Sequence, residues 1–306
     1  MDSLIISKGF LIIIPRSPQG RAMQAKTLTW LFVGIVIGLI AGYAASLPIQ
    51  NSLQAKIASL EEKLSPKYVE KIKARGKLIV GTSADWPPFE YVDKEGNFAG
   101  IDIEIAKKIA EALGVELEIK DMKFAALIEA LRNGQIDMIL ADMTPTAERE
   151  QLVDFSIPYY FSKGNAVVTT KDRLSEFREV DDLKGKNIGV QLGTIQEEWA
   201  KENLGDKANI ISYDRVYPEM VMALKRGDID VMVVGDIIAS VIIEKDPDLA
   251  IAFYAGGTRI GAAVAVPQGA EDLKYVVNSV LEKMLETGEM EQIFKEEIAK
   301  WLGAGS

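Results

Sequence analysis

The chain has 306 residues, 48% of them hydrophobic and 26% charged, which is enough for two globular domains and an accessory segment. Its net charge of −10 argues against nucleic acid as a partner, because such an interface needs basic side chains to neutralise phosphates. It contains neither cysteine nor histidine, which excludes disulfides, thiol catalysis, Ser-His-Asp chemistry and histidine-based zinc sites. We therefore expect a binding function rather than catalysis, with no cofactor and no metal.

The N-terminal region predicts a membrane segment. Residues 27–55 carry no charge, and residues 28–47 are mostly apolar and long enough to cross a bilayer. Basic residues precede this stretch, so we expect residues 1–26 in the cytoplasm, residues 27–48 as a transmembrane anchor or signal sequence, and the rest outside the cell membrane. Cleavage after small residues would release a secreted protein. Translation could start at Met1 or at Met23.

A short helical stalk is expected at residues 49–76. Apolar residues recur there at spacings of four, three and four, typical of a two-heptad amphipathic helix: Leu53, Ile57, Leu60 and Leu64. Two heptads are short for a coiled coil, so a spacer is favoured over a dimerisation zipper. Ser65-Pro66 ends the pattern, and the body is expected to begin near Lys77.

The body alternates strand and helix patterns, which predicts parallel sheets covered by helices. Leu78–Val80 and Val115–Ile119 have strand patterns. Ile101–Leu113 has the helical period and ends at a glycine, and Leu127–Leu131 predicts the next helix. The tail, Leu273–Trp301, predicts helix with a break at Thr287-Gly288.

One eight-residue pattern, A-L-x-x-G-x-I-D, occurs twice, at Ala130–Asp137 and Ala223–Asp230. Each copy ends a helical stretch and enters an apolar run that ends at a carboxylate, Asp142 or Asp236. The repeat predicts two similar α/β lobes that present polar groups at the carboxyl ends of their strands. Chance recurrence of a common helix-to-strand phrase is the alternative.

Several side chains at these strand ends could bind a zwitterion. Thr146 could cap a helix beginning at Ala147, leaving backbone N–H groups for an anion. Arg149, about one turn later, could bind a carboxylate in bidentate geometry; a surface arginine paired with a neighbouring glutamate is the alternative. Asp236 would supply the opposite charge, or else only cap a helix.

Other residues in the body have both a structural and a binding interpretation. Thr194 is expected to be the N-cap of a helix over Ile195–Leu204. Trp86 and Phe124 follow strands, where they could form either aromatic walls or core.

Four linked segments carry a family resemblance: GTSADWPPFEY at Gly81–Tyr91, GIDIE at Gly100–Glu104, TAER at Thr146–Arg149 and DFSIPYY at Asp154–Tyr160. In this order they resemble the polar amino-acid solute-binding proteins of ABC importers (family 3, type II periplasmic-binding fold), from about Lys77 to Trp301. The resemblance implies an α/β two-lobed periplasmic-binding-protein fold with two hinge crossings, here after the membrane helix and stalk. The crossings are expected near Phe161–Ala166 and near Arg259–Val264. Lobe 1 would comprise residues 77–163 plus 263–306, and lobe 2 residues 164–262.

The resemblance also implies roles for individual residues. Arg149 matches the arginine that binds the ligand carboxylate, with Thr144 and Thr194 as further contacts to the ligand backbone atoms. Asp236 matches the acid that receives the ammonium group. Trp86 and Phe124 match the aromatic residues that enclose the side chain.

Two departures affect ligand identity. Ser83 stands where histidine-, glutamine- and lysine-binding relatives carry aspartate, and Asp142 stands where they carry Gly or Ser. Gln191 matches another position that contacts the ligand side chain. An unpaired ligand carboxylate beside Asp142 and Gln191 would be strongly unfavourable, so a polar or cationic amino acid is expected rather than Asp or Glu.

The function expected is an extracytoplasmic amino-acid receptor whose lobes close over a free amino acid and which docks on ABC permease subunits. A secreted dehydratase of the same fold, using Asp142 or Glu90 as general acid, is one alternative. A membrane-tethered ligand sensor is the other.

Overall fold

The computed structural model describes residues 4–7, 10–13, 50, 52–54, 56, 67–256 and 260–303. The chain divides into two units, residues 1–65 and 66–306. In the first unit, β1 (Leu4–Ser7) pairs antiparallel with β2 (Phe10–Ile13). Across the described residues, no helix has the length and apolarity needed to cross a membrane. The predicted membrane segment, residues 27–48, lies outside those residues, as does most of the expected stalk ahead of residue 67.

The second unit begins with α2 (Lys67–Arg75), a helix that packs on the body. Its residues Val69 and Ile72 are buried. The backbone N–H groups of Tyr68 and Val69 donate to the Asp272 carboxylate, at 3.0 and 2.8 Å, in α8 (Glu271–Thr287). The compact unit therefore starts at Pro66, ahead of the expected start near Lys77, because the amphipathic helix α2 follows the proline and packs on α8.

Two five-stranded sheets form the centres of two lobes within this unit. The first sheet has the order β7 (Glu116–Asp121), β3 (Lys77–Thr82), β8 (Met138–Ile139), β15 (Ile260–Pro267) and β9 (Val153–Ser162). The second has the order β12 (Asn209–Tyr213), β11 (Asn187–Gln191), β13 (Val231–Gly235), β10 (Asn165–Thr170) and β14 (Leu249–Ala255). In each sheet the first three strands are parallel and the fourth is antiparallel to its neighbours. The two-lobed α/β architecture is thus confirmed.

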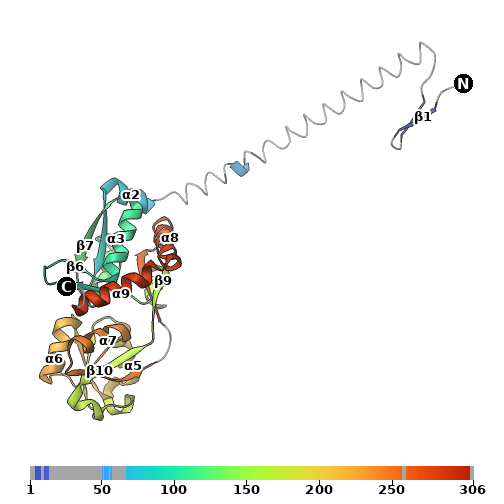
Figure 1. The fold of residues 1–306 in the computed structure, drawn as a ribbon. Coiled ribbons are helices and arrows are strands. Elements are labelled where there is room, and N and C mark those ends of the chain that lie inside the picture. Colours follow the sequence, from blue (N-terminus) through green and yellow to red (C-terminus); the bar gives the residue numbers. More distant parts are fainter. Residues whose placement is uncertain are drawn as a thin grey trace. The chain divides into compact units, whose positions relative to one another are not determined.

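Helices cover both sheets, as Figure 1 shows. The first lobe carries α3 (Ile101–Leu113), α4 (Leu127–Arg132), α8 and α9 (Glu289–Leu302), and the second carries α5 (Ile195–Asn203), α6 (Val221–Arg226) and α7 (Asp236–Lys245). The C-terminal helix α9 contacts α3 of the first lobe and α7 of the second. A small sheet of β4 (Asp85–Trp86), β5 (Glu90–Val92) and β6 (Phe98–Ala99) adjoins α3. Short helical turns complete the described elements: η1 (Phe124–Ala126), η2 (Arg149–Gln151), η3 (Lys171–Glu176), η4 (Val180–Leu183), η5 (Gly205–Lys207) and η6 (Val216–Met220).

The chain passes between the lobes at two places. Residues 163–164 join β9 of the first sheet to β10 of the second. Residues 256–259 join β14 of the second sheet to β15 of the first, and of these the structure describes only Gly256. The expected crossings, at Phe161–Ala166 and Arg259–Val264, include these connections at least in part.

The repeated sequence pattern has the same structure in both lobes. The glycine of each copy adopts left-handed geometry after a helix, with φ of 68° and 80°. The Asp137 N–H donates to Ile79 O at 2.7 Å, and the Ile79 N–H donates back to the Asp137 carboxylate at 2.7 Å. Asp230 and Asn187 repeat this exchange at 2.8 and 2.7 Å. The aspartate of the pattern therefore fastens the incoming strand to its parallel neighbour, which supports a structural repeat over chance recurrence.

Candidate ligand-binding site

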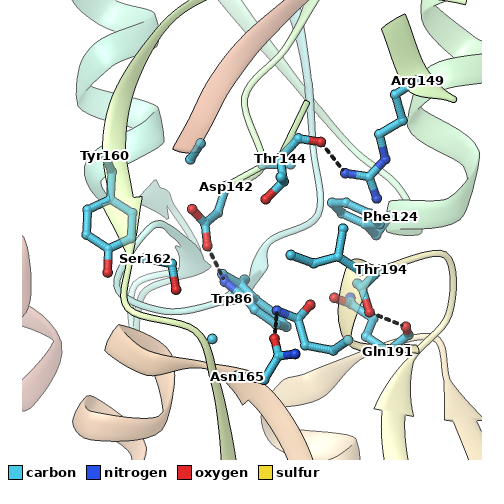
Figure 2. Close-up of a pocket in the computed structure, with 15 residues that line it drawn as sticks. Trp86, Phe124, Asp142, Thr144, Arg149, Tyr160, Ser162, Asn165, Gln191 and Thr194 are labelled. Atoms are coloured by element: carbon cyan, nitrogen blue, oxygen red, sulfur yellow. Dashed lines mark hydrogen bonds between the residues drawn. The ribbon is translucent and has the colours of Figure 1, made fainter. Parts of the chain in front are cut away.

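A cavity lies between the two sheets and contains about 520 Å³ of empty space, part of it open to solvent. Both lobes contribute to its wall. Seven of the nine predicted site residues line it, and these are Trp86, Phe124, Asp142, Thr144, Arg149, Gln191 and Thr194. Figure 2 shows Arg149 and Phe124 on one side of Asp142, with Tyr160 and Ser162 on the other. Strand ends and the turns after them thus bring together side chains far apart in the sequence.

Arg149 is a buried cation, and its hydrogen bonds within the described residues go only to neutral groups. It is 9% exposed and donates to Thr144 O at 2.6 Å and, across to the second lobe, to Gly193 O at 2.9 Å. Its guanidinium carbon lies 5.3 Å from the centre of the Phe124 ring. Burial lowers the pKa of Arg149 to about 10, and no carboxylate in the described part of the chain lies within 4.0 Å of it. A buried guanidinium that lacks a nearby carboxylate is suited to bind an anion that enters the cavity.

The turn that carries Arg149 is shorter than predicted. Instead of a helix from Ala147, the chain forms the single 3₁₀ turn η2. Thr146 Oγ1 accepts the Arg149 N–H at 3.3 Å, although the N-cap residue of η2 is Glu148. The helix cannot continue because strand β9 begins at Val153.

A true helix N-terminus reaches the cavity from the second lobe. Thr194 caps α5 by accepting the Glu197 N–H at 3.2 Å, and its hydroxyl donates to Gln191 O at 2.7 Å. Thr194, Ile195 and Gln196 all line the cavity. The positive end of the helix dipole therefore faces the same space as Arg149, which favours negative charge there. The prediction of Thr194 as N-cap is confirmed.

Asp142 is held in an unusual backbone conformation at the cavity wall. Its φ is 45°, a region that aspartate tolerates better than most residues. Its N–H donates to Asp102 at 2.7 Å, and its carboxylate accepts from Trp86 Nε1 at 2.9 Å. Burial raises the pKa of Asp142 well above its usual range, and the nearby Asp102 adds to this. The carboxylate is thus placed to be ionised by a cationic group entering the cavity.

Further acidic groups lie behind Asp142, away from the cavity wall. Asp102 and Glu90 are fully buried, and burial raises the pKa of Asp102 to about 7 and that of Glu90 well above its usual range. Glu90, a candidate general acid by sequence, does not line the cavity. Among the described residues, no group of three or more His, Cys, Asp or Glu side chains has the arrangement of a metal site.

The structure does not place Ser83 or Asp236 in the cavity wall. Ser83 is 1% exposed, and its hydroxyl donates to the Asp85 carboxylate at 2.5 Å. Asp236 lies at the start of α7 after the N-cap Gly235. Its carboxylate accepts from the Tyr160 and Ser162 hydroxyls, both at 2.8 Å, and from the Lys163 N–H at 3.0 Å.

Four polar residues of the wall were missed from the sequence, and they are Tyr160, Ser162, Asn165 and Gln196. Tyr160 and Ser162 are two residues apart on β9, so they share one face of the strand. That period, and the place of Ser162 within the expected crossing at Phe161–Ala166, could have indicated them. Gln196 Nε2 donates to Asn165 Oδ1 at 3.2 Å, a contact between α5 and β10 that no local pattern signals.

Comparison with known proteins identifies the family to which the chain is similar. Residues 78–304 match the family described as bacterial extracellular solute-binding proteins, family 3. The chain is 41% identical to the arginine-binding extracellular protein ArtP of Bacillus subtilis, over 74% of this chain and 86% of that protein. It is 33% identical to the L-cystine-binding protein TcyJ of Escherichia coli, over 77% and 86%.

Solved structures show the same similarity. A mutant of ArgBP from T. maritima superposes with a TM-score of 0.70 at 38% identity, covering 77% of this chain and 99% of that one. The substrate-binding protein AbpA of Streptococcus pneumoniae, bound to L-arginine, gives a TM-score of 0.73 at 34% identity, covering 76% and 99%. The fold is therefore the two-lobed periplasmic-binding fold, and the chain belongs to the bacterial extracellular solute-binding proteins of family 3.

Proposed function

We propose that this protein is the extracytoplasmic receptor of an ABC importer and binds a free polar or cationic L-amino acid between its lobes. The observation that carries the proposal is the buried Arg149 guanidinium, which faces the cavity without a carboxylate within 4.0 Å in the described residues. Relatives at 41% and 33% identity are named for binding arginine and cystine, both amino acids with a carboxylate and an ammonium group.

The two charged ends of an amino acid would bind at different parts of the wall. Arg149 would receive the carboxylate in bidentate geometry, next to Thr144 and the N-terminus of α5 capped by Thr194. The ammonium group would lie toward Tyr160 and Ser162. Asp236, bonded to both of those hydroxyls, would supply the negative potential there.

The ligand side chain would lie between Trp86 and Phe124 and extend toward Asp142 and Gln191. A cationic tip would ionise Asp142, whereas a ligand carboxylate beside it would be repelled and left without a partner. L-Arginine is the first candidate, because it fits this charge pattern, because one relative is named for binding arginine, and because a similar solved structure is bound to L-arginine.

Closure of the lobes would form the binding site and would be the signal that the permease subunits recognise. We place lobe 1 at residues 77–163 plus 263–306, together with α2, and lobe 2 at residues 164–262. The body would lie outside the cell membrane, held by residues 27–48 as an uncleaved anchor or released as a secreted protein if that segment is cleaved.

We propose binding without chemical turnover. Of the two candidate general acids, Glu90 does not reach the cavity wall, and Asp142 is engaged by Trp86. A tethered sensor would use the same site but would need a signalling partner in place of a permease.

Calorimetry with a panel of L-amino acids tests the proposal. The protein is first unfolded and refolded to remove any ligand carried through purification. Saturable binding of one or more polar or cationic amino acids is expected, with no binding of aspartate or glutamate. Failure of every L-amino acid to bind would contradict the proposed function, and conversion of prephenate or arogenate would favour the dehydratase alternative.

A further inference from the structure

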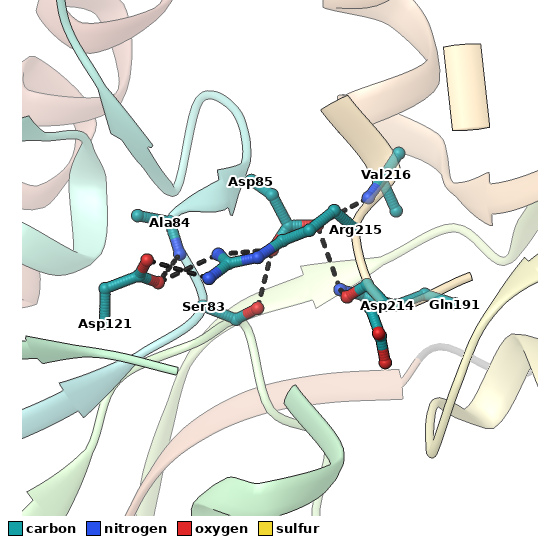
Figure 3. Close-up of polar contacts among 8 residues, drawn as sticks. All are labelled: Ser83, Ala84, Asp85, Asp121, Gln191, Asp214, Arg215 and Val216. Carbon is teal, nitrogen blue, oxygen red and sulfur yellow. Dashed lines mark hydrogen bonds and ion pairs between the residues drawn. The ribbon is translucent and has the colours of Figure 1, made fainter. Parts of the chain in front are cut away.

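Asp85 is a buried carboxylate of the first lobe that bonds mainly to the second lobe, as Figure 3 shows. It is 2% exposed and lies in β4, directly before the cavity residue Trp86. From the second lobe, the Val216 N–H and Gln191 Nε2 donate to its Oδ2 at 2.6 and 3.0 Å. Arg215 lies 3.5 Å from its Oδ1. From its own lobe it accepts the Ser83 hydroxyl.

A second set of contacts holds the same loop of the second lobe. Arg215 donates to both carboxylate oxygens of Asp121, at the end of β7, at 2.8 Å each. Lys123 of the first lobe pairs with Asp214 at 2.6 Å. Burial raises the pKa of Asp85 to about 6, although the bonds from Ser83 and Val216 and the nearby Arg215 oppose this rise. Residues 214–216 of the second lobe therefore contact the first lobe around the buried Asp85 carboxylate.

These contacts fix the orientation of the Gln191 side-chain amide. Its two amide hydrogens have two acceptors, Asp85 Oδ2 at 3.0 Å and Asp214 O at 3.3 Å. The reversed amide would place its oxygen against both acceptors, so only one orientation is favourable. Gln191 lines the cavity, and its Oε1 is then the polar atom that it can offer to a ligand. An oxygen at this position accepts hydrogen bonds and does not donate them.

We propose that Asp85 is a positioning residue that couples lobe closure to ligand selection by directing Gln191 Oε1 toward the cavity in the closed state. The proposal rests on the proposed amino-acid binding function. With the lobes apart, water solvates Val216 N–H and the Gln191 amide. With the lobes together, these donors are buried and need the Asp85 carboxylate. Ligands whose side chains end in N–H donors would then be preferred over ligands with an acceptor at the same place.

Two substitutions separate the role of the acceptor from that of the charge. In Asp85→Asn, the amide oxygen can still accept from Val216 and Gln191, so closure and selectivity should remain close to those of the wild type. In Asp85→Ala, both buried donors lose their acceptor. Closure should become unfavourable, and L-arginine affinity should fall by at least about tenfold.

Selectivity is read from L-arginine and L-citrulline, which differ at the side-chain tip, where an N–H donor is replaced by a carbonyl oxygen. The arginine-to-citrulline affinity ratio should fall in Asp85→Ala, because the Gln191 amide becomes free to rotate, and should be retained in Asp85→Asn. An unchanged ratio in Asp85→Ala would overturn the proposal.

Closure is measured directly in the full-length protein, which has no native cysteine, by labelling Glu111→Cys in the first lobe and Lys207→Cys in the second. Electron paramagnetic resonance then gives the distribution of distances between labels, with and without L-arginine. The proposal predicts a smaller closed population in Asp85→Ala than in the wild type or Asp85→Asn, even without ligand. Equal closed populations in all three proteins would overturn it. Failure of the wild type to bind any amino acid would instead contradict the proposed function, and the ligand-free distances would still test Asp85.

Discussion

Replacing Arg149 by methionine should abolish most of the ligand affinity while leaving the ligand-free protein folded. Methionine keeps much of the side-chain volume and removes the charge. The guanidinium is 9% exposed, and it donates to two backbone carbonyls, Thr144 O and Gly193 O, but to no carboxylate in the described residues. The substitution therefore removes the group assigned to the ligand carboxylate and little else.

The size of the effect follows from the burial of the charge. Lowering the pKa of Arg149 from the usual arginine value to about 10 corresponds to about 3 kcal/mol of unfavourable free energy for the charged form. A ligand carboxylate would offset this, and truncation of buried charge pairs costs roughly 2–5 kcal/mol. We expect a loss near 3 kcal/mol, or roughly a hundredfold in Kd. In the ligand-free protein the substitution has two opposing effects on stability. It removes the hydrogen bonds to the two carbonyls, about 1 kcal/mol each, and it also removes the unfavourable burial of the charge.

Calorimetry with L-arginine and urea unfolding without ligand measure the two effects separately. Binding of L-arginine by Arg149→Met within threefold of the wild type would mean that Arg149 does not bind the ligand carboxylate. A loss of several kcal/mol of unfolding free energy in the ligand-free variant would mean that Arg149 is a structural residue.

Three further predictions concern the acid of the cavity and the fold repeat. Asp142→Asn should weaken binding of L-arginine at least about tenfold while changing L-citrulline binding little, and equal losses in calorimetry would remove Asp142 from the side-chain site. Burial and Asp102 raise the pKa of Asp142, so binding a cationic ligand should release a proton. Affinity for L-arginine should accordingly rise with pH until the ligand-free pKa is passed, and a flat profile in wild type would contradict this. Gly189→Ala should lower the unfolding free energy in urea by about 1–3 kcal/mol, because its Cβ would lie 2.4 Å from Ile229 Cδ1; unchanged stability would mean that this approach is not tight.

Local signals predicted much of the fold. Helix α3 ends at Gly114 in left-handed geometry, and Gly288 separates α8 from α9, as expected. Thr194 caps α5, which ends one residue earlier than predicted. These features depend on residues close together in the sequence. In contrast, the prediction of a helix from Ala147 was wrong. Strand β9 begins soon after that residue, and its pairing with β15 joins residues that are far apart in the sequence.

The candidate site was predicted best in the segment that follows β8. Asp142 lies three residues after that strand ends and Arg149 ten residues after it, and both line the cavity. The orientation of Asp236 depends on its hydrogen bonds from the Tyr160 and Ser162 hydroxyls. Both of those residues lie on β9, at the end of the first sheet's strand that leads into the second lobe. Such contacts depend on the register of distant strands, which no local pattern encodes.

The inter-lobe contacts of Asp85 were missed for a related reason. Its partners at Gln191 and Val216 are more than a hundred residues away in the sequence and lie in the other lobe. Ser83 was assigned to the ligand by its place in the motif, but it bonds to Asp85. The arrangement of the two lobes in this structure brings these groups together.

A crystal structure of the protein with L-arginine would show directly how the ligand is oriented. We expect the ligand carboxylate on the Arg149 guanidinium, the ammonium group toward Tyr160 and Ser162, and the side chain between Trp86 and Phe124. Electron density for L-arginine elsewhere on the protein, or in the cavity with its carboxylate turned away from Arg149, would contradict this expectation.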